Sequence, residues 1–118
     1  MIEPHLQFVG AGYEVGAAGP EAFDCSGVCL AYLRRLGLEV PDGAFEGING
    51  DIWQLRGALQ DVQLERGDVV LSMTEDGGLH VDVAINASRV LTAIKGRGVA
   101  VRRAYAITNP LGVYRLRR

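Results

Sequence analysis

The chain has no long hydrophobic run, and this absence sets the first limits on its class. It has 118 residues, and no stretch approaches the ~20 consecutive apolar residues of a membrane-spanning helix. Its start, MIEPHLQFVG, lacks the basic residues and long apolar segment of a secretory signal. We therefore expect a protein made in the cytoplasm, without membrane insertion. The length fits one domain over residues 1–118.

Cysteine is scarce as well, because the chain holds only Cys25 and Cys29. The two lie four residues apart on one expected helix, a geometry that does not favour a disulfide. No second pair exists to complete a zinc site. Free thiols fit a reducing compartment, so the sequence predicts two free cysteines and no metal site.

Acidic residues are missing from the last third of the chain. All 14 of them lie at or before Asp82, together with four arginines, which gives a charge of −10. Residues 83–118 hold seven arginines and Lys95, which gives +8. This asymmetry is typical of a docking surface, but it also arises when two halves interleave and their charges mix. Because no aromatic-rich stacking motif accompanies the basic residues, nucleic-acid binding is not expected.

Helical signals come first along the chain and strand signals follow. After 22 Gly- and Ala-rich residues that predict a loop, residues 24–37 show helical spacing, with Asp24 as the cap and Gly37 just beyond the end. A weaker helix is expected over Asp51–Leu59. Five β-branched runs separated by turns predict strands near residues 67–73, 79–85, 89–94, 98–104 and 112–118. The sequence therefore predicts an α+β domain with N-terminal helices packed on a five-stranded antiparallel sheet.

A cysteine opens the first expected helix in the segment FDCSGVCLAYLRRLG, residues 23–37. The reactive form of cysteine is the thiolate, and a free thiol with a pKa of ~8.5 is mostly protonated at neutral pH. The N–H groups and dipole of a helix start lower that pKa and also bind an oxyanion. Cys25 is therefore a candidate nucleophile, and the alternative is a small residue packed near a helix start.

A histidine in the second half of the chain offers a general base. His5 precedes any ordered pattern, whereas His80 lies in the strand segment LHVDVAI. Alternation places His80, Asp82 and Ala84 on one face and apolar side chains on the other. We expect the apolar face to turn away from the helix start, so that His80 points toward Cys25 and forms a Cys–His pair.

These segments resemble the NlpC family of papain-like cysteine peptidases. FDCSGVCLAYLRRLGLEVP looks like the family's nucleophile segment, in which Asp-Cys-Ser-Gly opens the central helix. LERGDVVLS is similar to its strand entering the sheet, and LHVDVAINASRVLTAIKGRGVAVRR to its histidine hairpin. The resemblance covers about Gly10 to Arg103. The absent secretion signal and the ending NPLGVYRLRR look most like the members associated with phage tails.

The resemblance implies a papain-like fold and a role for each matching residue. Cys25 would be the nucleophile and His80 the base that takes its proton. Tyr13, in GAGYEVG, matches an upstream tyrosine whose hydroxyl lies near the oxyanion. Asp24 and Ser26 would line the substrate groove, and each also has a local reading, as helix cap or first-turn hydroxyl.

The residue that holds the base departs from the family pattern. The family has a histidine, an asparagine or a similar polar group at the position that Thr92 occupies here. A threonine hydroxyl can accept a hydrogen bond from the imidazole, but it is short. Asp82 stands where the family commonly has glycine, and it is a second candidate for orienting His80.

The resemblance implies a cysteine endopeptidase that cleaves peptidoglycan stem peptides after γ-D-glutamate, without a metal or organic cofactor. It also implies a component of a phage or phage-like tail, with tail-tip proteins as partners. Two alternatives stay open. One is a structural tail-tip module without appreciable catalysis, which Thr92 and the basic C-terminal third favour. The other is a related thiol amidase or acyltransferase that acts on a different amide.

Overall fold

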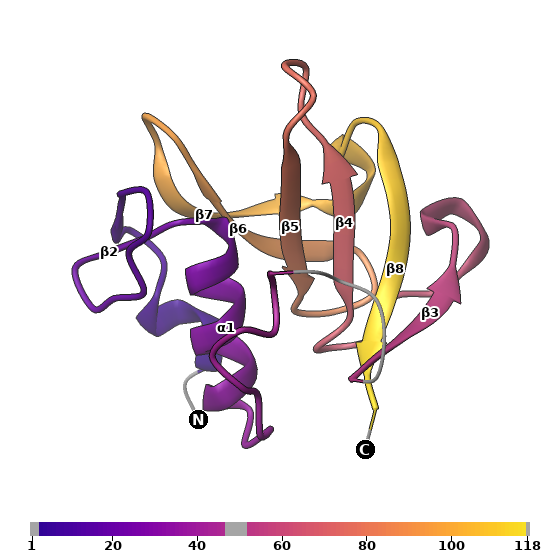
Figure 1. Cartoon of the computed structure of the whole chain (residues 1–118), viewed down its shortest axis with the longest axis horizontal. Coiled ribbons are helices and arrows are strands. Elements are labelled where there is room, and N and C mark those ends of the chain that lie inside the picture. The colour runs from indigo at the N-terminus through magenta and orange to yellow at the C-terminus, as the bar shows by residue number, and fades with distance from the viewer. Residues whose placement is uncertain (1–2, 47–51, 118) are drawn as a thin grey trace.

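One α-helix and a six-stranded antiparallel sheet form the core of the fold (Figure 1). The computed structural model describes residues 3–46 and 52–117. The helix is α1 (Cys25–Arg35), and three short 3₁₀ turns are η1 (Pro4–Gln7), η2 (Leu59–Asp61) and η3 (Ala104–Ala106). The strands are β1 (Gly12–Tyr13), β2 (Ala22–Phe23), β3 (Trp53–Gly57), β4 (Val69–Met73), β5 (Leu79–Ala84), β6 (Arg89–Ile94), β7 (Gly98–Arg103) and β8 (Pro110–Leu116). In the described part of the chain, no helix has the length and hydrophobicity to cross a bilayer.

The large sheet has the strand order β3-β8-β4-β5-β6-β7. Strands β4 to β7 form a meander in chain order. β8 returns to the free side of β4, and β3 pairs outside β8. The short strands β1 and β2 pair in parallel, beside α1 and in contact with β7 of the large sheet (Figure 1).

The expected mixed architecture is confirmed in outline, but the prediction of a second helix is wrong. Asp51 lies outside the described residues, and residues 53–57 form strand β3. Trp53 is buried and its indole N–H donates to the carbonyl of Ala44 at 2.8 Å. Leu55 is 59% exposed. Pairing with β8 outweighs the weak helical pattern, so the described residues form one α-helix and a large sheet of six strands, instead of the expected two helices and five strands.

Helix α1 begins and ends where the sequence predicts. The Asp24 carboxylate accepts the Gly27 N–H at 2.6 Å and caps the first turn. Gly37 follows the last turn with a φ of 91°, the left-handed conformation that glycine adopts without strain. The buried face of the helix, which packs on β5 and β6, consists of Gly27, Val28, Cys29, Tyr32 and Leu33.

The face of β5 that packs on the helix is the opposite of the one expected. Val81 and Val83 belong to the same core cluster as the helix residues Val28 and Cys29. Ala84 belongs to a second cluster on the other side of the sheet. The apolar face of β5 therefore covers α1, because burying the valines against the helix removes more apolar surface from water than turning them outward.

His80 still reaches the helix start because β5 and β6 separate. The two strands pair only at Val83↔Leu91 and Ala84↔Val90, whereas β6 and β7 pair along six positions. In Figure 1, β6 and β7 run across β4 and β5 rather than alongside them. The N-terminal half of β5 therefore has an open edge toward the start of α1.

The two cysteines of α1 occupy this open edge. The backbone N–H of Val81 hydrogen-bonds to the Cys25 sulfur, and the Cys29 thiol lies 3.8 Å from the Val81 carbonyl oxygen. Val83, two residues on, is paired with Leu91 of β6. The sulfurs thus take the place of a strand partner for Val81, which satisfies backbone groups that would be costly to bury alone.

The acidic and basic parts of the chain interleave in the fold. Arg102 pairs with the buried Asp82 at 2.8 Å. Arg115 pairs with Glu65 at 2.6 Å and with the buried Asp68 at 3.2 Å. Of the two readings that the sequence left open, charge mixing therefore accounts for Arg102 and Arg115.

Gly27 provides a test of how the N-terminal loop packs on the helix. Its missing side chain admits the Ala17 carbonyl oxygen, which would lie 2.2 Å from a Cβ at this position. We expect Gly27→Ala to lower the free energy of unfolding by about 1–3 kcal/mol, despite the better helix propensity of alanine. Urea unfolding followed by circular dichroism measures this. Gly43→Ala, whose Cβ would meet only the Glu46 side chain, is the control; equal stability of the two variants would contradict the close packing.

Candidate active site

Cys25 is the first residue of α1, and its thiol is held by two hydrogen bonds. One partner is the His80 imidazole and the other is the Val81 backbone N–H. Burial raises the pKa of the Cys25 thiol. These hydrogen bonds and the positive charge of His80 together lower it by more, so the pKa lies below its ordinary value. The geometry therefore favours the thiolate.

The His80 ring is fixed from its other side by two polar groups. Its Nε2 lies 2.6 Å from Asp82 Oδ1 and 2.9 Å from Thr92 Oγ1. Since Nε2 is engaged, Nδ1 is the ring nitrogen left for the Cys25 sulfur. Burial lowers the pKa of His80, but the hydrogen bonds and charges of Asp82 and Cys25 raise it to about 9. At neutral pH His80 is then an imidazolium, and its positive charge favours the thiolate form of Cys25.

Asp82 and Thr92, the two sequence candidates for orienting the ring, both contact it. Asp82 is 1% exposed. Burial raises the pKa of its carboxyl, but hydrogen bonds from His80 and Thr92 and the charges of His80 and Arg102 bring it below its ordinary range. The carboxylate is therefore ionised and accepts the Nε2–H, while the Thr92 hydroxyl donates to the carboxylate. Asp82 supplies the charge, and Thr92 completes its hydrogen bonding.

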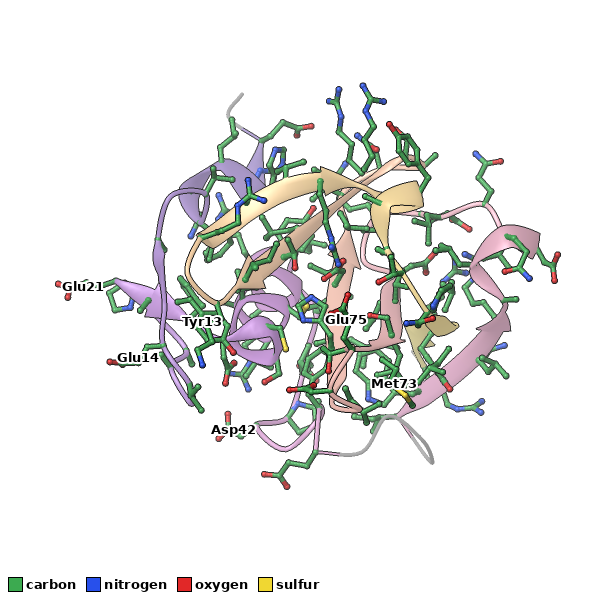
Figure 2. The ribbon with its side chains drawn as sticks, turned by 90° about the horizontal axis from the view of Figure 1, so that it is seen from above. Tyr13, Glu14, Glu21, Asp42, Met73 and Glu75 are labelled. Atoms are coloured by element: carbon green, nitrogen blue, oxygen red, sulfur yellow. The ribbon has the colours of Figure 1, made fainter. Side chains whose placement is uncertain are left out.

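Tyr13 lies beside the start of α1 (Figure 2). It pairs with Phe23 across the β1–β2 ladder, two residues before Cys25. Burial raises the pKa of its phenol, and the charges of Cys25 and Asp24 raise it further. The hydroxyl is therefore protonated at neutral pH, and it lies near enough to Cys25 and Asp24 for their charges to act on it. The backbone N–H groups of Cys25 and Ser26 in the first turn are not used by the helix itself.

Asp24 and Ser26 have structural contacts in addition to their place in the groove. Asp24 Oδ1 accepts from Gly27 N–H and from the Ser26 hydroxyl at 3.1 Å, and Oδ2 accepts from Gly16 N–H at 2.9 Å. Asp24 therefore caps the helix and fastens the Gly-rich loop to it. Both readings of Asp24 that the sequence left open are compatible with this geometry.

Two adjoining pockets form a groove at Cys25. One, of about 200 Å³, is lined by Cys25, Ser26, Phe45, Glu46, Leu71, Leu79 and Val81. The other, of about 270 Å³, extends along the N-terminal loop and shares Ser26, Phe45 and Glu46 with it. A larger apolar pocket of about 420 Å³ lies elsewhere, around Leu59, Val62 and Tyr105. The lining of that pocket includes no cysteine, histidine or carboxylate, so the chemistry assigns the site to the groove at Cys25.

Sequence reasoning did not single out Phe45, Glu46 or Arg102. Phe45 and Glu46 come from a loop without a motif, and they reach the groove only through the fold. Arg102 contacts Asp82 across 20 residues of chain, so no local spacing announces the contact. Over residues 3–46 and 52–117, the His, Cys, Asp and Glu side chains form no group that could hold a metal ion.

Comparison with known proteins gives one family match and several structural neighbours. The model of the NlpC/P60 family matches residues 10–110. NlpC1 from Trichomonas vaginalis superposes with a TM-score of 0.72 at 23% identity, over 97% of this chain and 42% of that one. NlpC2 from the same organism gives 0.71 at 21%, over 95% and 44%. An NLP/P60-family protein from Staphylococcus aureus, described as similar to a lipoprotein, gives 0.65 at 20%, over 98% and 39%.

At these identities the structural neighbours show a shared fold. The chain spans less than half the length of each of them. No match is found among curated proteins.

The thiolate at Cys25 can be measured without a substrate. We expect iodoacetamide to alkylate Cys25 with a midpoint below the ~8.5 of a free thiol, and His80→Ala to move that midpoint upward because a hydrogen bond and a positive charge are lost. Cys29 is an internal control, since burial raises its pKa well above the ordinary value and its side chain is inaccessible. Mass spectrometry of the two peptides over pH 5–10 gives both rates. An equal midpoint in wild type and His80→Ala would contradict the ion pair.

Proposed function

The chain belongs to the NlpC/P60 family, whose members are generally cysteine peptidases of the cell wall, and we propose that it hydrolyses an amide bond in peptidoglycan stem peptides. The single observation that carries this proposal is the contact of Cys25 with His80, whose far nitrogen lies 2.6 Å from a buried carboxylate. This arrangement provides a nucleophile, a proton carrier and a group that fixes the proton carrier.

In the proposed reaction, the Cys25 thiolate attacks the carbonyl carbon of the scissile amide and the C=O electron pair moves onto oxygen. The first-turn N–H groups of α1 and the Tyr13 hydroxyl donate to this oxyanion. As the oxyanion collapses, the C–N bond breaks and the His80 imidazolium gives its Nδ1 proton to the leaving amine. A thioester on Cys25 and a neutral imidazole remain.

The thioester is then hydrolysed by the same residues. His80 takes a proton from water, the resulting hydroxide attacks the thioester carbon, and the oxyanion again collapses. The C–S bond breaks, the product leaves as a carboxylic acid that loses its proton to solvent, and the Cys25 thiolate and His80 imidazolium are restored. His80 carries both proton transfers at the reacting centre, and the proposal includes no metal or organic cofactor.

We further propose that Asp82, on the same strand as His80, takes the role that the family gives to a residue at the position of Thr92. Its support is charge as well as distance, because an ionised carboxylate stabilises the imidazolium more strongly than a hydroxyl does. Two features of the sequence favoured an inactive structural module, Thr92 and the basic C-terminal third. Asp82 contacts the ring beside Thr92, and Arg102 and Arg115 of the basic third bind buried carboxylates, so these three residues no longer favour that alternative.

Two finer proposals rest on the sequence resemblance alone. The scissile bond is proposed to be the one after γ-D-glutamate, and the protein is proposed to act in a phage or phage-like tail, where it opens the wall locally. Fragment masses test the bond. Co-purification with tail particles, and with their tip proteins, tests the location.

Incubation with purified peptidoglycan tests the reaction itself. We expect wild type to release stem-peptide fragments whose masses identify the cleaved bond, and Cys25→Ala to release none. Cys29→Ser is the matched control, because it keeps a small donor near the Val81 carbonyl and leaves Cys25 in place. Release that persists in Cys25→Ala would contradict covalent catalysis, and release of sugar fragments alone would assign a different activity.

The roles of Asp82 and Thr92 are separable by conservative variants. We expect Asp82→Asn to lower kcat by about 10²–10⁴-fold, as loss of an orienting carboxylate does in related triads. Thr92→Val removes a hydrogen-bonding hydroxyl but no charge, so about a tenfold loss is expected. Initial rates on a soluble stem peptide measure both, with melting temperatures to check folding. A larger loss in Thr92→Val than in Asp82→Asn would assign the role to Thr92.

A further inference from the structure

The buried carboxylate of Asp82 has two oxygens with different partners. Oδ1 faces His80, whereas Oδ2 accepts two hydrogen bonds from Arg102, one from Nε at 3.1 Å and one from Nη2 at 2.8 Å. The guanidinium is 29% exposed and the carboxylate 1%. A carboxylate this deeply buried is costly unless its charge is balanced and its oxygens are hydrogen-bonded. Arg102 meets both needs.

Arg102 reaches Asp82 because of the opening between β5 and β6. It lies on the edge strand β7, where it pairs with Val90 of β6. Asp82 would stand opposite Thr92 if the β5–β6 ladder continued beyond Val83↔Leu91. The guanidinium therefore crosses β6 on the face that carries Thr92, and it closes the open side of the Asp82 carboxylate.

We propose that Arg102 is a positioning residue of this site, which holds Asp82 Oδ2 so that Oδ1 stays directed at His80 Nε2. The proposal deepens the proposed peptidase function and rests on it for its catalytic meaning. A planar guanidinium that grips one oxygen through two N–H groups fixes the rotation of the carboxylate as well as its position. Free rotation of Asp82 would exchange its two oxygens and leave the imidazole without a fixed acceptor.

Arg102 also balances the charge of the site. With the thiolate of Cys25, the imidazolium of His80 and the carboxylate of Asp82, its guanidinium makes a set of four groups with no net charge. Around this set, α1 and the residue before it contribute Cys29 and Asp24, β1 contributes Tyr13, and β6 contributes the neutral Thr92. Removing the positive charge of Arg102 leaves a net negative site, which makes every proton in it harder to remove.

Arg102→Met tests the role of Arg102, because methionine keeps an apolar stem but loses the positive charge and the two N–H donors that bind Asp82 Oδ2. Arg103→Met is the matched control, since Arg103 is the next residue on the same strand and its side chain is exposed. For Arg102→Met we expect the alkylation midpoint of Cys25 and the NMR titration midpoint of His80 both to move to higher pH, by about half a unit or more. His5, the other histidine of the chain, serves as an internal reference. Equal midpoints in the Arg102 and Arg103 variants would overturn the proposal.

Kinetics on a stem peptide separate position from charge. Arg102→Lys keeps the charge and loses the fork, so we expect kcat to fall by roughly tenfold while KM and both midpoints stay near their wild-type values. In Arg102→Met, kcat should fall by roughly 10- to 100-fold. In an Asp82→Asn background, adding Arg102→Met should cost nothing further, because Arg102 acts through Asp82. An unchanged kcat in Arg102→Lys, or full additivity with Asp82→Asn, would overturn the positioning role.

The two readouts also keep the two proposals apart. Alkylation and NMR need no substrate, so they decide the role of Arg102 even if wild type releases nothing from peptidoglycan. Absent release would refute the proposed function alone, and unmoved midpoints would refute the inference alone. If Arg102→Met does not fold, Arg102→Lys carries the decision.

Discussion

The separation of β5 from β6 beyond Val83 is the constraint on which the site depends. A strand that loses its neighbour exposes backbone N–H and C=O groups, and these must find other partners when they are buried. Here the main chain of Val81 is bound by the sulfurs of Cys25 and Cys29. The start of α1 is thereby fixed against β5. The Cys25 thiol comes to lie beside the ring of His80, the residue before Val81. In a ladder continued along the whole of β5, strand β6 would occupy this place.

The same opening determines how charge is distributed through the site. Asp82 is buried where a continuous sheet would place it opposite Thr92, and it receives donors from three strands: His80 of β5, Thr92 of β6 and Arg102 of β7. Each partner lowers the cost of burying the carboxylate, and the carboxylate in turn raises the pKa of the imidazole. Because the groups support one another, the ion pair of thiolate and imidazolium is a property of the whole network rather than of either residue.

The helix start is held equally firmly from its other side. Asp24 binds the first turn of α1 and the Gly16 amide at once, and Gly27 lets the Ala17 carbonyl approach the helix. The Gly-rich loop is therefore one wall of the groove, and Tyr13 enters the site from the same segment. Figure 2 shows Glu14 and Glu21 of this segment pointing away from the molecule, so the tyrosine is the side chain that the loop directs inward. Capping, loop docking and positioning of Tyr13 are thus one structural arrangement.

The sequence by itself determined the parts of this protein that depend on local chemistry. The cap at Asp24, the cysteine at the first turn, the end at Gly37 and five of the six sheet strands follow from spacing and turn residues, because these act over a few neighbours. Only the tertiary structure decided the rest. Residues 53–57 became a strand through pairing with β8, 56 to 63 residues away along the chain. Val81 and Val83 turned toward the helix because the larger core lies there. Asp82, Thr92 and Arg102 meet only where two strands part, and no local pattern encodes that separation, since it arises from the packing of the helix start against the sheet.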